Sequence, residues 1–407
     1  MKACILTLGC KVNEAESDSL LAGLEARGWE TSDVPCAADL YIINTCAVTA
    51  EAERKSRQAV ARLKKFNPSA PVLVCGCASQ RDPAAFSARD GVTVVTGTMR
   101  KDRLLDLLDE RGVFLATESA FCELPAPKRT HTRQNIRIQD GCDRFCSYCI
   151  IPYLRGRSRS RSAESIHAEA AACSAREIVL TGIDITSYRD GTRDLGDLLL
   201  SLADIPARIR LGSLEEGIVT REFLQKMKAA GNVCEHFHLS LQSGSDAVLR
   251  AMNRRYTRAQ YLAACALIYE FFPDAAITTD IIVGFPTETD ADFADSLSIV
   301  KEAGFARVHA FPYSSRPGTV AAKKRQLPAE VKRARMKQML ACAQTAEAAY
   351  LAKFAGRTFA ALFEEEGGYT PNYIRVYAEG AREGGMYEVR LTEREKDGYH
   401  AAIVKEI

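Results

Sequence analysis

Short apolar runs alternate with amphipathic stretches along the first 115 residues of the chain. The apolar runs have the length and continuity of buried parallel strands; they are ACILTL, LYIIN, PVLVC and VTVVT. The stretches between them have helical periodicity, over residues 14–28, 50–66, 83–88 and 101–111. Repeated strand–helix units of this kind predict a doubly wound parallel sheet for residues 1–115.

A second series of strand–helix units follows a segment of weak periodicity. Residues 116–134 are rich in Pro and Thr, so we expect a linker there. Beyond it, helical stretches separate six further apolar runs: NIRIQ, EIVLT, RIRLG, FHLSL, AITTDIIVG and ARVHAF. Six such units across residues 135–352 predict an open, partial (βα)6 barrel rather than the closed eight-unit form.

The pattern changes twice more towards the C-terminus. Residues 328–354 have one long helical pattern, and Pro328 suits the start of a helix. After Gly356 the apolar positions have a period of two, in FAALFEEE, YIRVYAE, MYEVRLTE and YHAAIVKEI. Gly-rich turns separate these runs, so residues 353–407 are predicted to form a small all-β barrel. The fold class is therefore α/β, with three domains.

Length and composition agree with three folded domains. A chain of 407 residues exceeds one ordinary compact domain, and 47% hydrophobic residues exclude a disordered protein. The net charge is only +2, so contact with nucleic acid requires a locally basic surface. The first residues lack the pattern of a signal peptide, and no apolar run is long enough to span a membrane. We therefore expect a cytoplasmic protein without membrane contact.

Fourteen cysteines are many for a protein of a reducing compartment. A disulfide framework fits poorly, because the chain is large and its thiols are scattered. Metal ligation or thiol chemistry explains the number better, although some cysteines are expected to be ordinary core residues.

Three cysteines lie close together in DGCDRFCSYCIIPY. Cys142, Cys146 and Cys149 follow the predicted strand NIRIQ with the spacing Cys-x3-Cys-x2-Cys. A structural zinc site needs four protein ligands, and the sequence supplies no fourth Cys or His nearby. Three thiolates suit a [4Fe–4S] cluster and leave its fourth iron open to a small ligand. The carboxyl end of a barrel strand is also where such folds hold their chemistry.

Three further cysteines follow predicted strands of the N-terminal sheet. Cys10, Cys46 and Cys77 come after the first, second and third strands. Ligands gather at the carboxyl ends of parallel strands, so these thiols are expected to converge there. A second cluster with an open iron fits such a site, and three unrelated core cysteines are the alternative. Cys75, inside the third strand, is a weaker candidate than Cys77.

Four arginines alternate along the run RGRSRSR, just after the three-cysteine loop. Arg155, Arg157, Arg159 and Arg161 flank the predicted mouth of the barrel, where a basic run would hold the phosphates of an RNA. A solvated basic loop is the alternative. Tyr373 lies among other tyrosines and basic residues of the C-terminal barrel, which suits stacking on RNA bases; packing in the barrel core is its alternative.

The three-cysteine spacing resembles the signature of the radical S-adenosylmethionine (SAM) enzymes. In that superfamily the open iron binds the amino and carboxylate groups of SAM, and reduction cleaves SAM to a 5′-deoxyadenosyl radical. The resemblance implies SAM contacts from an aromatic residue in the loop and from residues at later strand ends. These residues are Tyr148, Gly182, Asp184, Ser240, Gln242 and Gly284. The strand-end residues have an alternative as ordinary turns or helix caps.

Several motifs together resemble the methylthiotransferases. LGCKVNEAES, INTCAVT and CGCASQ precede IQDGCDRFCSYCIIPYLRGRSRSR, and a terminal β-barrel completes the pattern. The resemblance covers essentially the whole chain. It implies an N-terminal methylthiotransferase domain, a radical SAM domain and an RNA-binding TRAM domain. GCKVNEAES, GRSRSR and GYTPNY resemble the bacterial branch that modifies N6-threonylcarbamoyladenosine in tRNA.

The resemblance also implies a reaction, its cofactors and its partners. A methylthio group is inserted at C2 of N6-threonylcarbamoyladenosine at position 37, beside the tRNA anticodon. Two [4Fe–4S] clusters and two SAM molecules take part: the cluster on Cys10, Cys46 and Cys77 carries the sulfur, and the other cluster cleaves SAM. The expected partners are tRNA and an electron donor of the flavodoxin or ferredoxin type. We expect a monomer, and the sequence does not indicate the source of the sulfur.

Two alternatives remain open at this point. In the first alternative, the enzyme methylthiolates isopentenyl-adenosine in tRNA or a ribosomal-protein aspartate, although the GCKVN motif argues against both targets. The second alternative is a nonenzymatic iron–sulfur protein that binds RNA or passes electrons. Tyr148 and the open coordination position argue against it, because an electron carrier has fully ligated clusters.

Overall fold

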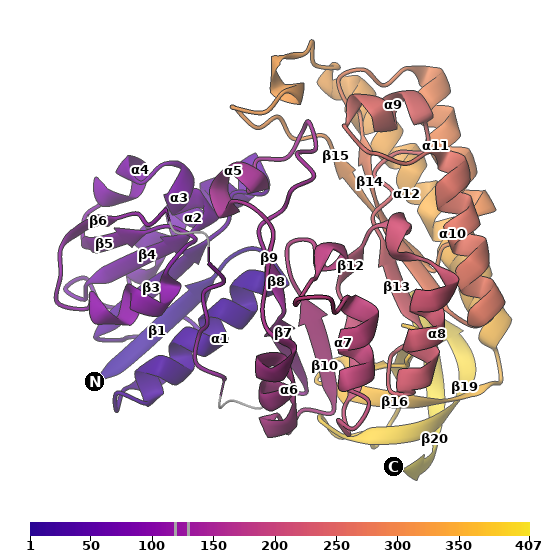
Figure 1. The fold of residues 1–407 in the computed structure, drawn as a ribbon, viewed down its shortest axis with the longest axis horizontal. Coiled ribbons are helices and arrows are strands. Elements are labelled where there is room, and N and C mark those ends of the chain that lie inside the picture. Colours follow the sequence, from indigo (N-terminus) through magenta and orange to yellow (C-terminus); the bar gives the residue numbers. More distant parts are fainter. Residues whose placement is uncertain (118–119, 128–130) are drawn as a thin grey trace.

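A six-stranded parallel sheet forms the N-terminal part of the computed structural model, which describes residues 1–117, 120–127 and 131–407 (Figure 1). The strand order is β2-β1-β3-β4-β5-β6. The strands are β1 (Lys2–Thr7), β2 (Glu30–Ser32), β3 (Leu40–Thr45), β4 (Val72–Gly76), β5 (Val92–Thr96) and β6 (Gly112–Phe114). The helical segments between them are α1 (Lys11–Glu25), α2 (Ala50–Leu63), α3 (Cys77–Arg81), α4 (Ala84–Ser87) and the 3-10 helix η1 (Lys101–Asp106).

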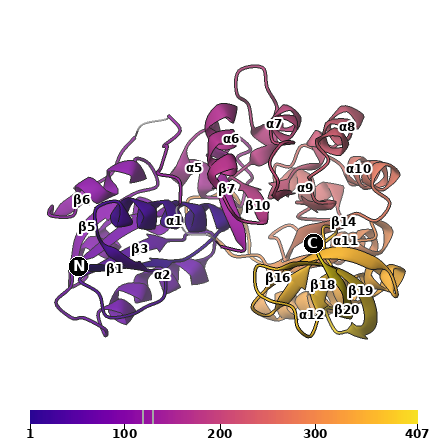
Figure 2. The same cartoon turned by 90° about the horizontal axis from the view of Figure 1, so that it is seen from below.

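Helices cover both faces of this sheet, which confirms the predicted doubly wound arrangement (Figure 2). Leucines of α1 pack with Ile5 and Ile42 in one hydrophobic core. Apolar residues of α2 pack with Tyr41 and Ile43 in another. Because side chains alternate along a strand, the continuous apolar run of β3 supplies both cores.

The sheet differs from the prediction at its edges. The short edge strands β2 and β6 have the sequences ETS and GVF, which carry no apolar run from which a strand could be predicted. Residues 101–111, predicted as one helix, form only η1 followed by a turn. Helix α1 begins at Lys11, three residues before its predicted start, directly after Cys10.

Six strand–helix units follow and form the predicted open arc (Figure 1). The arc consists of two parallel sheets, with the orders β7-β10-β11 and β12-β13-β14-β15. Its strands are β7 (Arg133–Arg137), β10 (Glu177–Thr181), β11 (Arg208–Leu211), β12 (Ser213–Leu214), β13 (His236–Leu239), β14 (Ala276–Val283) and β15 (Arg307–Pro312). The predicted strand RIRLG breaks at Gly212, so β11 and β12 belong to different sheets.

Helices line the outside of the arc. They are α6 (Ala163–Ala172), α7 (Leu195–Ser201), α8 (Arg221–Ala230), α9 (Asp246–Ala251), α10 (Arg258–Phe271), α11 (Asp290–Glu302) and α12 (Ala329–Leu351). Shorter segments are α5 (Ile151–Arg155), η2 (Ile185–Ser187), η3 (Glu216–Ile218), η4 (Ala321–Lys323), η5 (Ala352–Phe354) and the ribbon of β8 (Gln139–Asp140) with β9 (Arg159–Ser160). Among the described residues, no helix combines the length and apolarity that crossing a membrane requires.

The predicted linker, residues 116–134, lies between the two α/β parts. Residues 118–119 and 128–130 lie outside the described residues. The described linker residues form neither helix nor strand until β7 begins at Arg133, so the last two residues of the predicted linker belong to this strand.

A closed five-stranded barrel follows α12, as predicted for the C-terminus. Its strands are β16 (Thr358–Glu364), β17 (Gly367–Tyr369), β18 (Arg375–Tyr377), β19 (Met386–Glu395) and β20 (Gly398–Glu406). The barrel docks on the amino ends of the central strands, at β10, β11 and β13. There Arg208 donates to the carbonyl oxygen of Tyr369 at 2.8 Å, and Arg210 donates to that of Thr370 at 3.2 Å.

Glu177, the first residue of β10, holds these two arginines in place. Its carboxylate lies 2.8 Å from Arg210 and 2.5 Å from Arg208, and its side chain is fully buried. Burial alone would raise the pKa of Glu177, but the charges of Arg210 and Arg208 outweigh burial and lower the pKa to about 2. The ion pairs therefore stabilise the fold above an ordinary glutamate pKa of 4.5, and this contribution is lost as the pH falls from 4.5 towards 2.

We expect Glu177→Gln to destabilise the protein by about 3 kcal/mol at neutral pH, because it leaves buried guanidinium groups unpaired. The variant should also lose less stability than the wild type between pH 4.5 and pH 2. Urea unfolding across this pH range measures both effects. Glu222→Gln is the matched control, since this side chain is 75% exposed and its ion pair with Lys226 lies at the surface. An equal effect of the two substitutions would contradict the assignment.

Candidate functional site

Six cysteines from two parts of the chain line one cavity of about 270 Å³. Three of them, the N-terminal trio, come from the first sheet, and three, the central trio, come from the loop after β7. The two trios are Cys10, Cys46 and Cys77, and Cys142, Cys146 and Cys149. All fourteen cysteines of the chain are free thiols, so none of the six is withdrawn into a disulfide. Both predicted trios therefore meet in one site.

The N-terminal trio stands at the carboxyl ends of the adjacent strands β1, β3 and β4. Two of its members follow glycines that allow a close approach of the chain. Gly76, with φ of 106°, would place a Cβ 2.5 Å from the carbonyl oxygen of Thr45. A Cβ on Gly9, with φ of 118°, would lie 3.1 Å from the Cys46 sulfur. These positions accept only glycine without distortion.

Cys77 rather than Cys75 supplies the third thiol of this trio. Cys75 lies inside β4 and packs in the core that α1 covers, away from the cavity. Cys77 begins α3 and lines the cavity. Residues 75 and 77 would share one face of a continuous strand, but Gly76, with φ of 106°, ends β4 and turns the chain before Cys77.

The central trio is held by contacts between its loop and the end of α9. Ser147 donates through its backbone to the carbonyl oxygen of Met252 at 2.9 Å. Asn253 donates through its side chain to the carbonyl oxygens of Arg144 and Phe145, at 3.2 and 3.0 Å. Phe145 has a left-handed backbone, with φ of 47°, and these contacts hold that strained residue between Cys142 and Cys146.

The cysteines suit an iron–sulfur cluster better than a single metal ion. In the part of the chain that the structure describes, no three Cys, His, Asp or Glu side chains converge on one ion position. A [4Fe–4S] cluster instead distributes its thiolates over separate irons. Burial raises the pKa of Cys46 to about 11 and that of Cys142 and Cys149 to about 12, so metal binding displaces protons from them.

Arg155 joins the N-terminal sheet to the central arc beneath the cavity. It ends α5, six residues after Cys149, and its side chain has no solvent exposure. The guanidinium makes five hydrogen bonds. Its partners are Glu16 Oε1 (3.0 Å), Glu16 Oε2 (3.3 Å), Asp140 Oδ1 (2.9 Å), Asn13 Oδ1 (2.8 Å) and Cys77 Sγ (3.4 Å). All five N–H groups of the side chain are therefore used, including one on a cysteine sulfur.

Further buried charges complete this cluster, which we call the Arg155 network. Lys101 and Arg137 pair with Glu16, and Arg159 pairs with Asp140. Burial alone would raise the pKa of Glu16 and Asp140, but Arg155 and its neighbours outweigh burial and lower both values. Four cations thus surround two carboxylates. The surplus of positive charge lies next to the N-terminal trio, which favours an anionic ligand there.

A second arginine contacts the central trio in a similar way. Arg254 Nη1 lies 3.4 Å from the Cys146 sulfur and 2.7 Å from Glu215. Its Nη2 donates to the carbonyl oxygen of Ser240 at 3.1 Å. Each trio therefore has one cysteine sulfur that accepts a hydrogen bond from a guanidinium.

Five of the six predicted SAM-contact residues line the same cavity. They are Tyr148, Gly182, Asp184, Ser240 and Gln242. Gln242 has a left-handed backbone, with φ of 68°, which hydrogen bonds to Asp280 and Ile282 hold in place. Asp184 accepts from Ser187 at 2.6 Å and from Arg144 at 3.0 Å.

The structure does not bring Gly284 into this cavity. Its backbone N–H donates to Glu288 at 3.0 Å, and a Cβ there would lie 2.7 Å from Lys332 of α12. Gly284 therefore forms a bend that packs under α12, in agreement with the alternative of an ordinary turn.

The prediction that all four alternating arginines hold RNA is wrong for Arg155, because that side chain is buried. Arg159 and Arg161 are about nine-tenths buried and pair with Asp140 and with Glu123 and Glu169. Arg157 alone is open, with 72% of its side chain exposed. Glu16 lies 139 positions from Arg155, so no local pattern connects them. Asp140 and Glu169 lie only 19 and 8 positions from the arginines they bind, but nothing in the basic run itself marks them as partners.

Tyr373 does not lie near the cavity. Its ring stacks on His236, with centroids 4.1 Å apart, and also contacts Tyr369. This contact belongs to the interface between the C-terminal barrel and the amino end of β13, opposite to the end that carries the cavity. The ring is therefore a packing residue of that interface.

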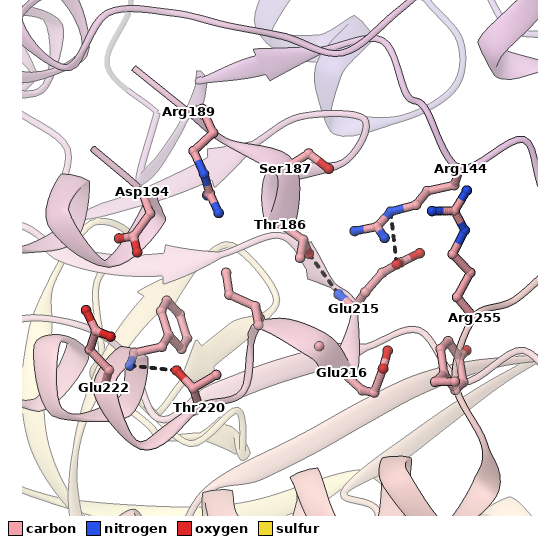
Figure 3. Close-up of a pocket in the computed structure, with 14 residues that line it drawn as sticks. Arg144, Thr186, Ser187, Arg189, Asp194, Glu215, Glu216, Thr220, Glu222 and Arg255 are labelled. Atoms are coloured by element: carbon pink, nitrogen blue, oxygen red, sulfur yellow. Dashed lines mark hydrogen bonds and ion pairs between the residues drawn. The ribbon is translucent and has the colours of Figure 1, made fainter. Parts of the chain in front are cut away.

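Among the charged lining residues, Arg144, Glu215 and Arg254 were not predicted. Arg144 lies inside the three-cysteine loop and could have been noticed as a charge between two ligands. Arg254 is 108 residues from Cys146, and no local pattern marks it. Arg144 and Glu215 also line a second pocket of about 490 Å³ beside the cavity (Figure 3).

Comparison with known proteins agrees with this geometry. The Radical SAM superfamily matches residues 136–300, and residues 2–97 match the Uncharacterized protein family UPF0004. The threonylcarbamoyladenosine tRNA methylthiotransferase MtaB of Chlamydia pneumoniae is 36% identical, over 98% of this chain and 97% of that protein. The chain belongs to the radical SAM methylthiotransferase family.

Other methylthiotransferases are similar as well. MtaB of Bacillus subtilis is 34% identical over 97% of this chain and 93% of its own length. The tRNA-2-methylthio-N(6)-dimethylallyladenosine synthase of Geobacillus thermodenitrificans is 34% identical over 96% of this chain and 81% of its own.

The fold of this methylthiotransferase also resembles solved structures. The radical SAM methyltransferase TsrM from Kitasatospora setae aligns with a TM-score of 0.57 and 15% identity, over 79% of this chain and 77% of TsrM. The cobalamin-dependent radical enzyme OxsB aligns with a TM-score of 0.54 and 12% identity, over 74% of this chain and 51% of OxsB. Both alignments confirm the architecture and carry no argument about the substrate.

We expect Arg155→Gln to lower the free energy of unfolding by about 3 to 5 kcal/mol, because Glu16 and Asp140 lose a buried partner. The N-terminal sheet should then unfold separately from the central arc. Calorimetry of the metal-free protein would show this as a split transition. Arg157→Gln is the control, since an exposed arginine contributes less than about 1 kcal/mol. A single unshifted transition in Arg155→Gln would contradict this role.

Proposed function

We propose that the protein inserts a methylthio group at C2 of N6-threonylcarbamoyladenosine at position 37 of tRNA, beside the anticodon. The observation that carries the proposal is the shared cavity, in which two trios of cysteines lie among the residues expected to bind SAM. An aromatic C–H bond resists ordinary acid–base chemistry, so a radical cofactor suits this reaction.

Each trio would hold one [4Fe–4S] cluster. The donor sets fit, because three thiolates leave one iron of each cluster open. The positive surplus of the Arg155 network further suits an anionic cluster on Cys10, Cys46 and Cys77. When bound, the clusters supply the electron that cleaves SAM and the sulfur that enters the product.

The residues of the cavity position the reactants. Tyr148, Gly182, Asp184, Ser240 and Gln242 would orient SAM beside the central trio. Arg254 holds the Cys146 sulfur, and Arg144 with Asp184 fixes the rim on the side of the second pocket. The cavity lies between the first sheet and the central arc, so a bound base would be shielded from water.

The choice of threonylcarbamoyladenosine rests on the relatives that match this chain throughout. The MtaB proteins align over nearly all of both chains, whereas the dimethylallyladenosine synthases extend beyond the aligned part. Exposed Arg157, whose guanidinium lies 4.8 Å from the Phe145 ring centroid, and exposed Tyr153 are suited to contact the RNA at the cavity rim. The proposal includes an electron donor of the flavodoxin or ferredoxin type and a monomeric enzyme.

Substitution of each trio by alanine should have a distinct effect. Alanines at Cys142, Cys146 and Cys149 should abolish SAM cleavage, and alanines at Cys10, Cys46 and Cys77 should preserve cleavage but abolish sulfur insertion. Each triple variant should lose about half of the iron that the wild type binds after anaerobic reconstitution. Cys75→Ala is the control and should retain both iron and activity. Sulfur insertion by the N-terminal triple variant would refute the assignment.

Nucleoside mass spectrometry tests the substrate directly. Cells without this gene should lose 2-methylthio-N6-threonylcarbamoyladenosine from their tRNA and accumulate the precursor that lacks the methylthio group. Restoring the gene should restore the modified nucleoside. If the methylthio derivative of isopentenyl-adenosine or a modified ribosomal aspartate disappeared instead, the proposed substrate would be wrong.

A further inference from the structure

The second pocket is a polar space continuous with the cysteine cavity. Arg144 and Glu215 line both, and the remaining walls come from η2 and the loop after it, from η3, from the start of α8 and from the turn after α9 (Figure 3). Its volume of about 490 Å³ exceeds the roughly 300 Å³ at which ligand pockets begin. No step of the proposed reaction described above uses this pocket.

Three of the four carboxylates that line the pocket already have a cationic partner. Glu215 pairs with Arg144 at 3.1 Å and with Arg254 at 2.7 Å. Asp194 and Glu222 contact Lys226, at 3.5 and 2.9 Å, and this lysine also pairs with Asp197 at 2.8 Å.

Glu216 is the remaining acid of the pocket. Burial, and then the charge of Glu215, raise its pKa. Among the described residues, no ion pair joins any of these acids to Arg189 or Arg255.

Two arginines of the pocket form no ion pair with a carboxylate of the described residues. Arg189 donates to the carbonyl oxygen of Tyr188 at 2.7 Å, and Figure 3 shows its guanidinium directed into the pocket. Arg255 comes from the turn after α9 and, with Arg144, also lines a small adjoining cavity. Both arginines are exposed, and within the described part of the chain neither has a carboxylate at ion-pair distance. An anionic group that enters the pocket would meet two available guanidinium groups.

The geometry of adenine indicates which anion would enter. C2 and N6 lie on the same edge of the base, on either side of N1. When C2 points into the cysteine cavity, a substituent on N6 must occupy adjoining space, whereas the sugar and phosphates lie on the opposite side of the base. We propose that Arg189 and Arg255 bind the carboxylate of the N6 substituent of the target adenosine. This assignment rests on the proposed function and makes the pocket the element that selects an anionic substituent over an apolar one.

The test compares RNA binding by the full-length, cluster-loaded protein. The probes are anticodon stem-loops that differ only at the target base: threonylcarbamoyladenosine, its carboxamide, which has the same shape but no charge, and unmodified adenosine. The wild type should bind the acid about tenfold more tightly than the carboxamide, as one charge-assisted contact provides. Arg189→Gln and Arg255→Gln should each remove most of this preference and leave binding of the other two RNAs unchanged.

Arg250→Gln is the matched control, because Arg250 is an exposed arginine of α9 that does not line the pocket. It should preserve the preference for the acid. If Arg189→Gln and Arg255→Gln weakened the binding of all three RNAs equally, these arginines would contact RNA phosphates instead, and the assignment would be overturned. An unchanged preference in both variants would overturn it as well. If the wild type modified isopentenyl-adenosine RNA but not threonylcarbamoyladenosine RNA, the proposed function itself would fail, which is a separate result.

Discussion

The buried guanidinium of Arg155 is the contact on which the site depends. It lies without solvent exposure between Glu16 of α1, which covers the first sheet, and Asp140 of β8, and it donates to the Cys77 sulfur. Burying a charge is costly unless every donor finds a partner, and here all five do. The same helix, α5, places Ile150 and Leu154 near its ends in the core of the first sheet. The two halves of the chain are therefore fixed relative to each other at the place where their cysteines meet.

The contacts of Arg155 explain why two separately folded parts of the chain form one cavity. Parallel strands bring Cys10, Cys46 and Cys77 to one edge of the first sheet, and the loop after β7 presents the central trio. Neither part alone encloses a base. A second buried ion pair, between Arg316 after β15 and Glu53 of α2, also joins the two parts. The C-terminal barrel docks at the other end of the arc, through Arg208, Arg210 and Glu177, so it does not shape the cavity.

Elements with strong local patterns could be predicted from the sequence, but contacts between residues distant in the sequence could not. The apolar runs predicted the parallel sheet, the six-unit arc and the final barrel, and strand ends predicted which cysteines would converge. The short edge strands β2 and β6 were not predicted, because they carry no apolar run. The prediction that Arg155 binds phosphate fails because two of its buried partners, Glu16 and Asn13, lie 139 and 142 positions away, where no local pattern marks them. The position of Arg189 and Arg255 in a common pocket likewise depends on the tertiary fold alone.

Electron paramagnetic resonance of the reduced, cluster-loaded protein tests the central claim, that two clusters share one cavity. Two paramagnetic clusters at such close range should give a spectrum broadened by spin–spin interaction. That broadening should disappear when either trio is replaced by alanine, leaving the simple spectrum of the remaining cluster. A wild-type spectrum equal to the sum of the two single-cluster spectra would contradict the account, because it would place the clusters too far apart to act on one base.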